Sequence, residues 1–509
     1  MTGSSDRDEL AKFGYQPSFE RRTSKFASFA VAFAFVSIAT GIFTTYGSVL
    51  NSSGPLGIWT WPIAVVGQLA VAFVIGSLAS RIPVTGYAYQ WTSRLANPVL
   101  GWIIGWISFM FLAVVVVAVD YTVASTVLPV LLSYEATTGI TWAITAVILI
   151  GQALLIGISQ RWTEKVNNTA VTAELVGMVL LTVLLLVVAA FRSQMDFGNL
   201  WSRGAIPAEG YWSFGDWTSA GPWMLGFLLG AFTIVGFESA ANLAEETNDP
   251  ERVVPRAMWQ AVLASGVLGF LFLIAVTLAA GDPIALAESG TPIADVIENT
   301  LGSVVSTLLL LLVVLAIFAC GLVIMLTGTR LTWAMSRDER FPGWKQLKQV
   351  SPRYGTPLKA TIMYVVLAEV ILGLFSLFSE DALFTLFGAA TLLPAVIYAA
   401  TVALYLAKRR SLPANGKFEL GKWEAPTLVV AVIWLVFELA LFRDTSFRDA
   451  WLYVLALLVI GAVYLVGLLA TRGRSALDMP DMHSIDAELD HKSPTPTDSS
   501  APTNQKAQA

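Results

Sequence analysis

A succession of long apolar stretches constrains this chain more than any other feature of its sequence. The hydrocarbon core of a bilayer is about 30 Å thick, and one helix needs roughly 20 apolar residues to cross it. Twelve stretches meet this requirement, at about residues 27–50, 57–80, 99–132, 139–160, 166–191, 222–247, 256–280, 301–336, 357–378, 382–407, 424–442 and 449–471. Only 13% of the 509 residues are charged, too few for the surface of a soluble protein. The sequence therefore predicts an all-α integral membrane protein with twelve transmembrane helices.

The lysines and arginines set the expected orientation, because they concentrate in cytoplasmic loops. If the N-terminus is cytoplasmic, only four of the 31 lysines and arginines fall on the outer side: Arg192, Arg203, Arg443 and Arg448. All the others fall in segments predicted to be cytoplasmic, so none is left for the membrane interior. We therefore expect a multi-pass protein of the plasma membrane with both termini in the cytoplasm.

The spans and loops give the chain a predicted organisation in seven parts. These are a cytoplasmic N-terminal segment 1–26, spans 1 to 5 (27–191), an extracellular loop 192–221, spans 6 to 10 (222–407), a cytoplasmic loop 408–423, spans 11 and 12 (424–474), and a cytoplasmic tail 475–509. The tail is rich in Ser, Thr, Pro and Asp, and we expect it to be disordered.

The supply of reactive side chains excludes several kinds of catalysis. Cys320 is the single cysteine, and both histidines, His483 and His491, lie in the tail. The apolar body therefore lacks the residues for a histidine-based catalytic site or a cysteine-cluster metal site. There is also no phosphate-binding glycine loop beside a strand. We expect no enzymatic activity, no metal site and no cofactor other than a coupling ion.

Two predicted spans carry small and polar residues in mid-membrane, at Ser37–Phe43 in span 1 and Thr233–Ala240 in span 6. If the helices unwind there, free N–H groups can bind an anion and free carbonyls can bind a cation. Span 1 starts inside and span 6 outside, so five-helix units beginning at each would be inverted repeats. Discontinuous spans at matching places in two such halves indicate a transporter's binding site. The alternative is that the small residues only permit close helix packing.

Five ionisable residues fall within predicted spans: Asp120, Glu174, Glu238, Glu369 and Glu438. Such groups are costly in a membrane and mark functional sites by default. All five are acids, so each is either protonated or meets a cation from solution. Glu238 lies in the predicted break of span 6, whereas Glu369 and Glu438 lie in spans that we do not expect to line a central site. Those two can equally be protonated carboxyls bonded to their own helices.

Several motifs in these segments resemble the amino acid–polyamine–organocation superfamily of secondary transporters, over about residues 20–475. The run 39–43 (Ala-Thr-Gly-Ile-Phe) is similar to the superfamily's Gly-Ser-Gly-Ile-Phe, and the run from Pro83 to Trp91 resembles its signature after span 2. Gly236-Phe237-Glu238-Ser239-Ala240, followed by Ala-Glu-Glu-Thr at 244–247, resembles its span 6 signature. The motifs are most similar to the amino acid/choline branch, which includes carriers of 4-aminobutyrate and choline.

The resemblance implies a five-plus-five inverted repeat with broken helices 1 and 6, plus peripheral helices 11 and 12. It also implies a set of substrate-binding positions. The substrate carboxylate would bind at Thr40, Gly41 and Ile42, the ammonium would meet carbonyls at Ser37, Ile38 and Val235, and Gly236 and Asp120 would lie near the substrate.

Two further positions carry implied roles from relatives in the same superfamily. Phe232 matches an aromatic residue that occludes the substrate in arginine/agmatine exchangers, and Glu238 matches their proton-sensing glutamate. Some members have a span 5 lysine in the place of a sodium ion, where this chain has Glu174. That departure disfavours a lysine-based proton mechanism and allows a carboxylate that binds H⁺ or Na⁺ at Glu174.

Together these features predict a secondary active transporter that imports amino acids or related amines such as 4-aminobutyrate by ion-coupled alternating access. One alternative is a permease for an organic cation such as choline, ethanolamine or a polyamine. Another is a membrane amino acid sensor that does not transport. The expected partners are a small-molecule substrate, the lipid bilayer and possible second copies meeting through spans 11 and 12. No nucleic acid partner is expected.

Overall fold

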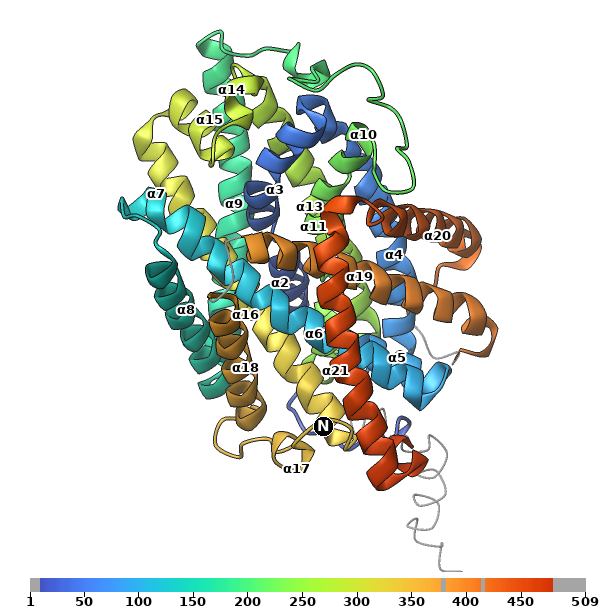
Figure 1. Ribbon diagram of the computed structural model, residues 1–509. Helices are drawn as coiled ribbons and strands as arrows, with labels where there is room; N and C mark the ends of the chain where they lie inside the picture. The colour runs from blue at the N-terminus through green and yellow to red at the C-terminus, as the bar shows by residue number, and fades with distance from the viewer. Residues whose placement is uncertain (1–9, 377–380, 413–416, 479–509) are drawn as a thin grey trace, which may run out of the picture. The chain divides into compact units, whose positions relative to one another are not determined.

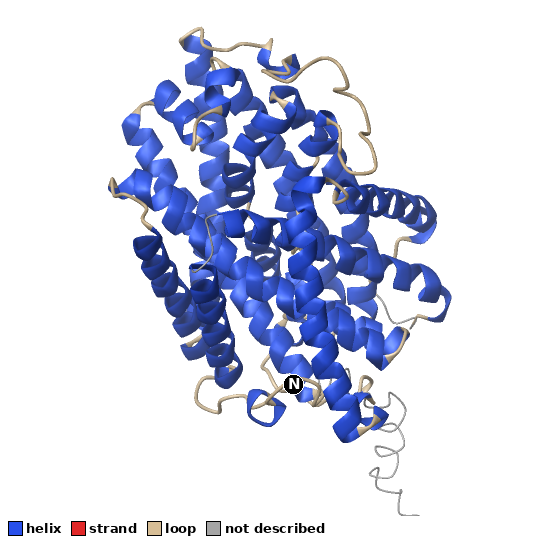
Figure 2. Cartoon of the chain, in the orientation of Figure 1, coloured by secondary structure: helices blue, strands red, loops and turns tan. Residues whose placement is uncertain are grey.

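The computed structural model describes residues 10–376, 381–412 and 417–478, and these ranges consist of helices and connecting loops (Figures 1 and 2). Residues 19–478 form one compact unit. No β-strand occurs in the described ranges, although one isolated parallel bridge joins Thr23 and Thr247. The end of the predicted tail, residues 479–509, lies outside the described part of the chain. The predicted all-α fold class is confirmed.

The first half of the chain forms helices that correspond to predicted spans 1 to 5. Their bounds are α2 Lys25–Val36, α3 Ile38–Ser53, η1 Pro55–Trp59, α4 Thr60–Arg81, α5 Tyr87–Leu95, α6 Pro98–Thr122, η2 Val123–Val127, α7 Leu128–Leu132, α8 Thr138–Ile158 and α9 Gln160–Phe191. Spans 1 and 3 are each built from more than one element. In span 3 a π-helical turn, η2, follows α6 directly.

The second half forms the helices of predicted spans 6 to 12 and the connections between them. The short elements are η3 Asn199–Trp201, α10 Pro222–Gly226, α11 Leu228–Thr233, α12 Ser239–Asn242, η4 Ala244–Glu246, α14 Pro283–Ala287, α15 Pro292–Leu301, α17 Trp344–Leu347, η5 Arg409–Ser411, η6 Gly421–Trp423, η7 Thr445–Phe447 and η8 Arg474–Leu477. The long helices are α13 Pro250–Leu278, α16 Ser303–Arg337, α18 Leu358–Ser376, α19 Asp381–Lys408, α20 Glu424–Leu441 and α21 Arg448–Arg472.

Ten helices in the described part of the chain are long and apolar enough to cross a membrane. They account for all the predicted spans except spans 6 and 9. Span 6 is divided into α10, α11 and α12, so it contains no long continuous helix. Span 9 corresponds to α18, whose end adjoins residues 377–380, outside the described ranges. We call the side of the membrane at which α2 begins the N-side.

Span 1 is interrupted at one residue, Ser37, which separates α2 from α3. Its backbone lies at φ 33° and ψ 96°, in a region that residues with a side chain rarely adopt. The predicted break is therefore confirmed, but it is shorter than the predicted run 37–43. Residues 38–43 already belong to α3, because every N–H in its first turn finds a partner, as described below.

Span 6 is interrupted over a longer stretch, from Ile234 to Glu238, between α11 and α12. Gly236 lies at φ 81°, and a Cβ atom on it would sit 1.8 Å from Cδ1 of Phe35. Glycine is required here both for its backbone conformation and for the close approach of α2. The second predicted break is thus confirmed as well.

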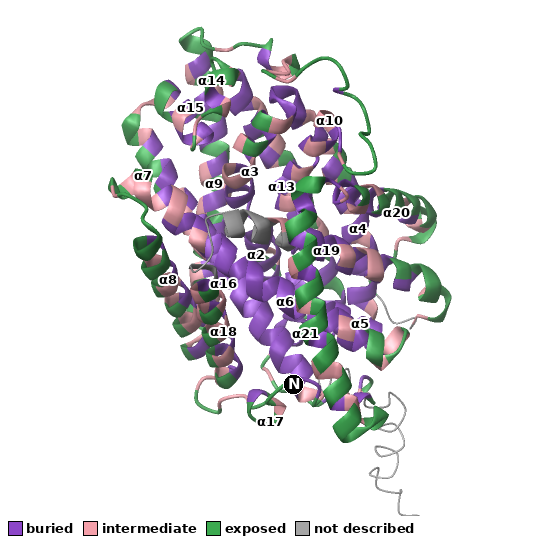
Figure 3. Ribbon diagram, viewed as in Figure 1, coloured by how far each residue is buried: buried purple, intermediate pink, exposed green. Residues whose placement is uncertain are grey.

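The buried core of the bundle is centred on α6, which packs against α16 and α19, while α13 packs against α2 and α4 (Figure 3). The helices α8, α20 and α21 expose apolar side chains such as Val147, Ile433 and Val463, as helix faces in contact with lipid do. Spans 11 and 12 both pack against α19, and each has a further partner. Helix α20 packs against α4, whereas α21 packs against α6, where the Trp106 indole N–H donates to the Leu457 carbonyl at 3.0 Å.

Candidate functional site

Glu174 of α9 reaches the break in span 1 and binds the beginning of α3. Its Oε1 atom accepts hydrogen bonds from the Ser37 hydroxyl and from the Ala39 N–H, both at 3.1 Å. The side chain is 1% exposed. A carboxylate is favoured at this place because the first N–H groups of a helix carry a partial positive charge and have no partner inside the helix.

The remaining N–H groups in the first turn of α3 are also bonded within the chain. The Ile38 N–H interacts with the carboxylate of Glu174, as does that of Ala39. The Thr40 N–H faces the Ser37 hydroxyl oxygen at 3.4 Å. The positive end of α3 is therefore occupied by an acid from another helix and by the cap residue itself.

Glu238 forms the corresponding centre at the break in span 6. The Tyr398 hydroxyl of α19 donates to Oε2 of Glu238 at 2.5 Å and accepts from the Gly236 N–H at 2.8 Å. The ring of Tyr398 stacks on Phe237 at 5.1 Å between centroids. Tyr87 of α5, a buried residue with φ 29°, lies close enough to interact electrostatically with Glu238. One tyrosine thus holds both the acid and a backbone donor of the break.

The two breaks lie side by side. A Cβ atom on Gly41 of α3 would sit 2.2 Å from Cγ2 of Thr233, the last residue of α11. On the N-side of the breaks, the Ser239 hydroxyl donates to the Val31 carbonyl at 3.3 Å. The halves of span 1 therefore contact the halves of span 6 both before and after the interruptions.

The predicted substrate-binding positions are distributed around this contact. Ser37, Ile38, Thr40, Gly41 and Ile42 are all buried at the start of α3 or in the break before it. Three others belong to span 6, where Val235 and Gly236 are buried in the break and Phe232 is partly exposed on α11. These residues are brought together, while their roles in binding stay predictions.

Asp120 lies in a neighbouring buried site between α6, α8 and α16. Its Oδ1 atom accepts from the Gln152 side-chain amide at 2.9 Å and lies 2.3 Å from the place of a Cβ on Gly321. Cys320 of α16 interacts electrostatically with both Asp120 and Glu174, and its thiol donates to the Phe35 carbonyl at 3.4 Å. Asp120 therefore adjoins the Glu174 centre through Cys320.

The other two intramembrane acids lie away from the breaks. Glu438 of α20 is buried against α4, where the Gln68 amide donates to its Oε1 atom at 3.3 Å. Glu369 is half-buried on α18. Within the described residues, no group of three or more His, Cys, Asp or Glu residues is arranged to hold a metal ion.

Two buried ion pairs lie on the N-side of the breaks, where span 6 ends. Arg330 pairs with Glu246 at 2.5 Å, and Arg337 donates to both carboxylate oxygens of Glu245 at 2.9 and 3.0 Å. Glu245 and Glu246, which end span 6, are thus each paired with an arginine of α16. Arg330 lies within α16 and is 1% exposed, so its charge is buried in the protein. Glu246 compensates this buried charge, which hydropathy alone does not reveal.

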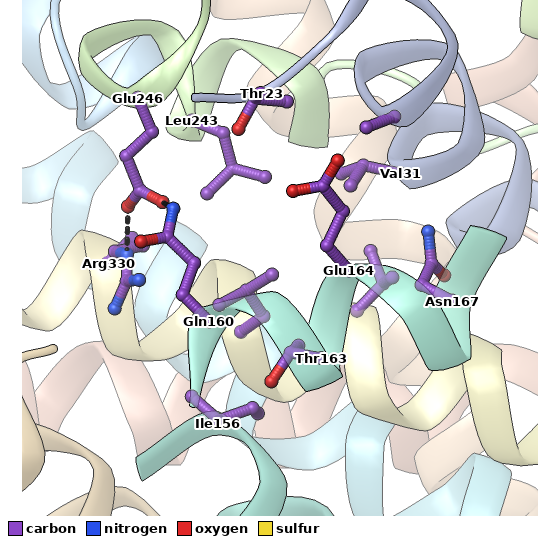
Figure 4. Close-up of a pocket in the computed structure, with 13 residues that line it drawn as sticks. Thr23, Val31, Ile156, Gln160, Thr163, Glu164, Asn167, Leu243, Glu246 and Arg330 are labelled. Atoms are coloured by element: carbon purple, nitrogen blue, oxygen red, sulfur yellow. Dashed lines mark hydrogen bonds and ion pairs between the residues drawn. The ribbon is translucent and has the colours of Figure 1, made fainter. Parts of the chain in front are cut away.

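A cavity of about 30 Å³ adjoins the Arg330–Glu246 pair, between α2, α9, η4 and α16 (Figure 4). The side chains of Glu246 and Gln160 point toward each other on one side of it, and Glu164 extends into it from the other side. Its volume is enough for a water molecule. A second cavity of about 20 Å³ lies on the opposite side of the breaks and is lined by residues that include Phe43, Thr126 and Ile293.

Sequence reasoning missed several residues of the site. Gln152 carries a signal, because an amide in an otherwise apolar span requires a buried partner. Tyr398 carries none, since tyrosine is common in apolar helices, and Tyr87 lies in the signature-like run 83–91 without any sign that it would reach Glu238. Their roles follow only from contacts between residues far apart in the chain.

Comparison with known proteins finds a matching family and several related transporters. The sequence profile of the family described as "Amino acid permease" matches residues 24–468. Amino-acid permease BAT1 of Arabidopsis thaliana is 26% identical over 84% of this chain and 86% of its own length. The GABA-specific permease of Saccharomyces cerevisiae is 26% identical over 85% of this chain and 77% of its own length. Thiamine transporter thi9 of Schizosaccharomyces pombe is 23% identical over 85% and 79%.

Proposed function

The chain belongs to the amino acid permease family, and from this premise we propose that it imports amino acids or related amines such as 4-aminobutyrate by ion-coupled alternating access. One observation carries the proposal. Two broken spans lie side by side in a multi-pass membrane protein, and each break holds a buried acid, Glu174 at the first and Glu238 at the second. This is the arrangement in which transporters bind a solute near the middle of the bilayer.

The break in span 6 supplies the groups that an ammonium requires. Ile234 and Val235 lie outside the helices, so their carbonyls are available to accept hydrogen bonds, whereas the Gly236 carbonyl accepts from the Ser239 N–H at 2.9 Å. Glu238 beside them supplies a negative charge. A proton or a sodium ion bound at Glu238 or Glu174 would be the coupled ion, because both acids are buried and neither forms an ion pair with a cation in the described part of the chain.

The proposed orientation places the N-side in the cytoplasm and the protein in the plasma membrane. The distribution of lysines and arginines supports it, since the N-side loops contain almost all of them. The apolar faces of α8, α20 and α21 would then contact lipid.

Permeation of an organic cation without a carboxylate is the second candidate function. It is favoured by the acidic character of the centre, in which Asp120, Glu174 and Glu238 are all buried. A thiamine transporter among the relatives also supports it, because thiamine carries a quaternary nitrogen. A sensor that binds an amino acid without moving it is the third.

Uptake by the full-length chain in proteoliposomes tests these functions. Radiolabelled alanine, 4-aminobutyrate and choline are offered with an inward pH gradient, an inward Na⁺ gradient, or neither. We expect one gradient to drive accumulation of an amino acid or 4-aminobutyrate, and an ionophore that collapses the gradient to abolish it. Accumulation of choline alone would favour the second function, and saturable binding without accumulation would favour the sensor. No gradient-stimulated uptake would contradict the proposal.

A further inference from the structure

The start of α3 is the place where the proposed function needs an anion site, and the chain's own carboxylate already occupies it. Glu174 binds the Ala39 N–H and the Ser37 hydroxyl, and the Thr40 N–H faces the hydroxyl of Ser37. A substrate carboxylate directed at this helix end finds no free donor in the first turn unless Glu174 moves.

We propose that Glu174 competes with the substrate carboxylate for the N-terminus of α3, and that a proton taken up by Glu174 permits the exchange. The inference rests on the proposed function, because it concerns the same site and the same class of substrate. It adds a mechanism of coupling. Proton and substrate bind together because the proton removes the charge that excludes the substrate carboxylate.

Electrostatics makes the two carboxylates mutually exclusive. Helix α3 presents a partial positive charge equivalent to roughly half an elementary charge at its first turn, which favours one anion. Two carboxylates in contact at one buried site repel each other strongly, so one of them must be protonated or displaced. The Ser37 hydroxyl and the Ala39 N–H are the two donors to Oε1 of Glu174, and the Ile38 N–H also interacts with this carboxylate.

Among the described residues, no lysine or arginine forms an ion pair with Glu174 that would have to break when Glu174 leaves the helix end. The second oxygen of Glu174, Oε2, is buried and has no hydrogen-bond partner in the part of the chain that the structure describes. The group that faces it from α16 is Cys320, beyond which lies Asp120 of α6. Helix α8, which also packs against α9, has no charged residue. The other helices around α9 carry their charged residues toward their ends, and these are Lys25 of α2, Glu251, Arg252 and Arg256 of α13, Asp295 and Glu298 of α15, and Arg330 and Arg337 of α16. A carboxylate without a cationic partner is neutralised most simply by a proton from solution.

The exchange predicts a difference between substrates with and without a carboxylate. When a substrate carboxylate replaces that of Glu174, the charge at the helix end is unchanged and one proton has been taken up. Linkage then requires that acid conditions tighten the binding of such substrates, by at most about tenfold per pH unit for one proton. A matched amine without the carboxylate leaves Glu174 in place, so its binding does not gain from this proton.

The test measures how the half-saturating concentration for uptake changes with pH in proteoliposomes, with alanine and 4-aminobutyrate as carboxylate probes. Ethylamine and propylamine, which correspond to alanine and 4-aminobutyrate without the carboxyl group, are assayed as competitors. For the wild type we expect the half-saturating concentration of the carboxylate probes to rise several-fold per pH unit toward alkaline pH. The inhibition constants of the amines should change much less.

Glu174→Gln is the central variant, because glutamine keeps the shape of the side chain and cannot titrate. We expect it to bind the carboxylate probes with an affinity that no longer depends on pH, to exchange them across the membrane, and not to accumulate them in a pH gradient. Ser37→Ala removes one of the two donors that hold Glu174, and we expect it to improve affinity at alkaline pH a few-fold. Glu369→Gln, an intramembrane acid away from the breaks, is the matched control and should retain the wild-type pH dependence.

Two results would overturn the inference: an unchanged pH dependence in both Glu174→Gln and Ser37→Ala, or equal pH dependence of the carboxylate probes and the amines. Gel filtration in detergent identifies a variant that fails to fold, and Ser37→Ala then decides the question. If the wild type accumulates none of the probes under any gradient, the proposed function fails first and the inference fails with it. Failure of the inference alone leaves gradient-driven uptake intact.

Discussion

Each of the two breaks is stabilised by a side chain from the fifth span of its repeat, but the hydrogen-bond donor and the acid are on opposite sides in the two cases. In each predicted repeat, the fifth span reaches the break in the first: α9 supplies Glu174 to span 1, and α19 supplies Tyr398 to span 6. At the first break the acid comes from the fifth span and the break supplies the donors. At the second break the acid is Glu238, part of the break itself, and the fifth span supplies a hydroxyl.

We call the interruption of span 1 at Ser37 break 1 and the interruption of span 6 from Ile234 to Glu238 break 6. The chemical difference between them suggests that each has its own task in the proposed mechanism. Break 1 is a single residue, and its donors are already satisfied by a side chain that can be exchanged for another anion. Break 6 extends over five residues, from Ile234 to Glu238, and its acid cannot leave because it belongs to the same stretch of backbone. We therefore expect break 6 to act as the fixed cation centre and break 1 as the exchangeable anion centre.

Glu238→Gln tests the fixed centre and should have the largest effect. Without a negative charge beside the carbonyls of break 6, we expect gradient-driven uptake to fall at least about a hundredfold, a loss of roughly 2.7 kcal/mol. Uptake in proteoliposomes checks this, with gel filtration to show that the variant is folded. Full gradient-driven uptake by this variant would remove Glu238 from the mechanism and leave break 1 as the only coupled centre.

Gly41→Ala tests the contact between the breaks and should have the next largest effect. The added methyl group would sit 2.2 Å from Cγ2 of Thr233, and overpacking of this kind costs about 1–3 kcal/mol. We expect a lower temperature of unfolding in detergent, measured by the scattering or fluorescence of the purified protein. Thr233→Ala removes two of the three nearest atoms, so the double variant should recover part of the loss. An additive double variant would show that the two residues do not meet.

Tyr398→Phe tests how break 6 holds its acid. The change removes the hydroxyl that binds Glu238 and leaves the Gly236 N–H without its partner, at a cost of about 1–3 kcal/mol for a buried unsatisfied donor. We expect reduced stability and slower uptake, while the pH dependence attributed to Glu174 persists. If Tyr398→Phe abolished that dependence, the two breaks would not be separate centres.

Lys417→Met should have the smallest effect, because it removes salt bridges that lie on the N-side and outside both breaks. Lys417 contacts Asp249 and Glu251 at 3.0 Å, and these hydrogen bonds raise the pKa of Lys417 above its ordinary value of 10.5. Its contribution to stability is complete below pH 10.5 and is lost as the pH rises through the raised pKa. Because the side chains are partly exposed, we expect a decrease in unfolding temperature of about 1 °C or less at pH 8, which disappears at strongly alkaline pH, and unchanged coupling. A change in coupling would mean that break 6 depends on how α13 is held.

The positions of the breaks could be predicted from the sequence because small and polar residues are costly in mid-membrane unless they serve a site. Ser37 and Gly236 both stand where the backbone leaves the helical conformation. The identity of the groups that fill the breaks could not be predicted. Glu174 lies 137 residues from Ser37, and Tyr398 lies 160 residues from Glu238. Such pairings depend on how helices pack, which the pattern of one helix does not specify.

Arg330 is a second residue whose surroundings the sequence does not predict. An arginine near the end of an apolar stretch is expected to reach a polar surface, because its charge is costly in the membrane. In the structure it is buried on Glu246, where Gln160 of α9 also donates a hydrogen bond. Charge counting therefore cannot detect a cation whose partner arrives from another span.

The contact between Gly41 and Thr233 has a consequence for how affinity should be understood. With α3 and α11 touching, a solute cannot lie between them at this level without separating them. Occupancy then requires a rarer conformation in which these helices stand apart. The measured dissociation constant is the intrinsic one divided by the fraction of molecules in that conformation. A protein populating it 1% of the time would, as an order of magnitude, appear about a hundredfold weaker than its site. A substitution of Thr233 that loosens this contact would thus tighten binding without changing a predicted substrate-binding residue.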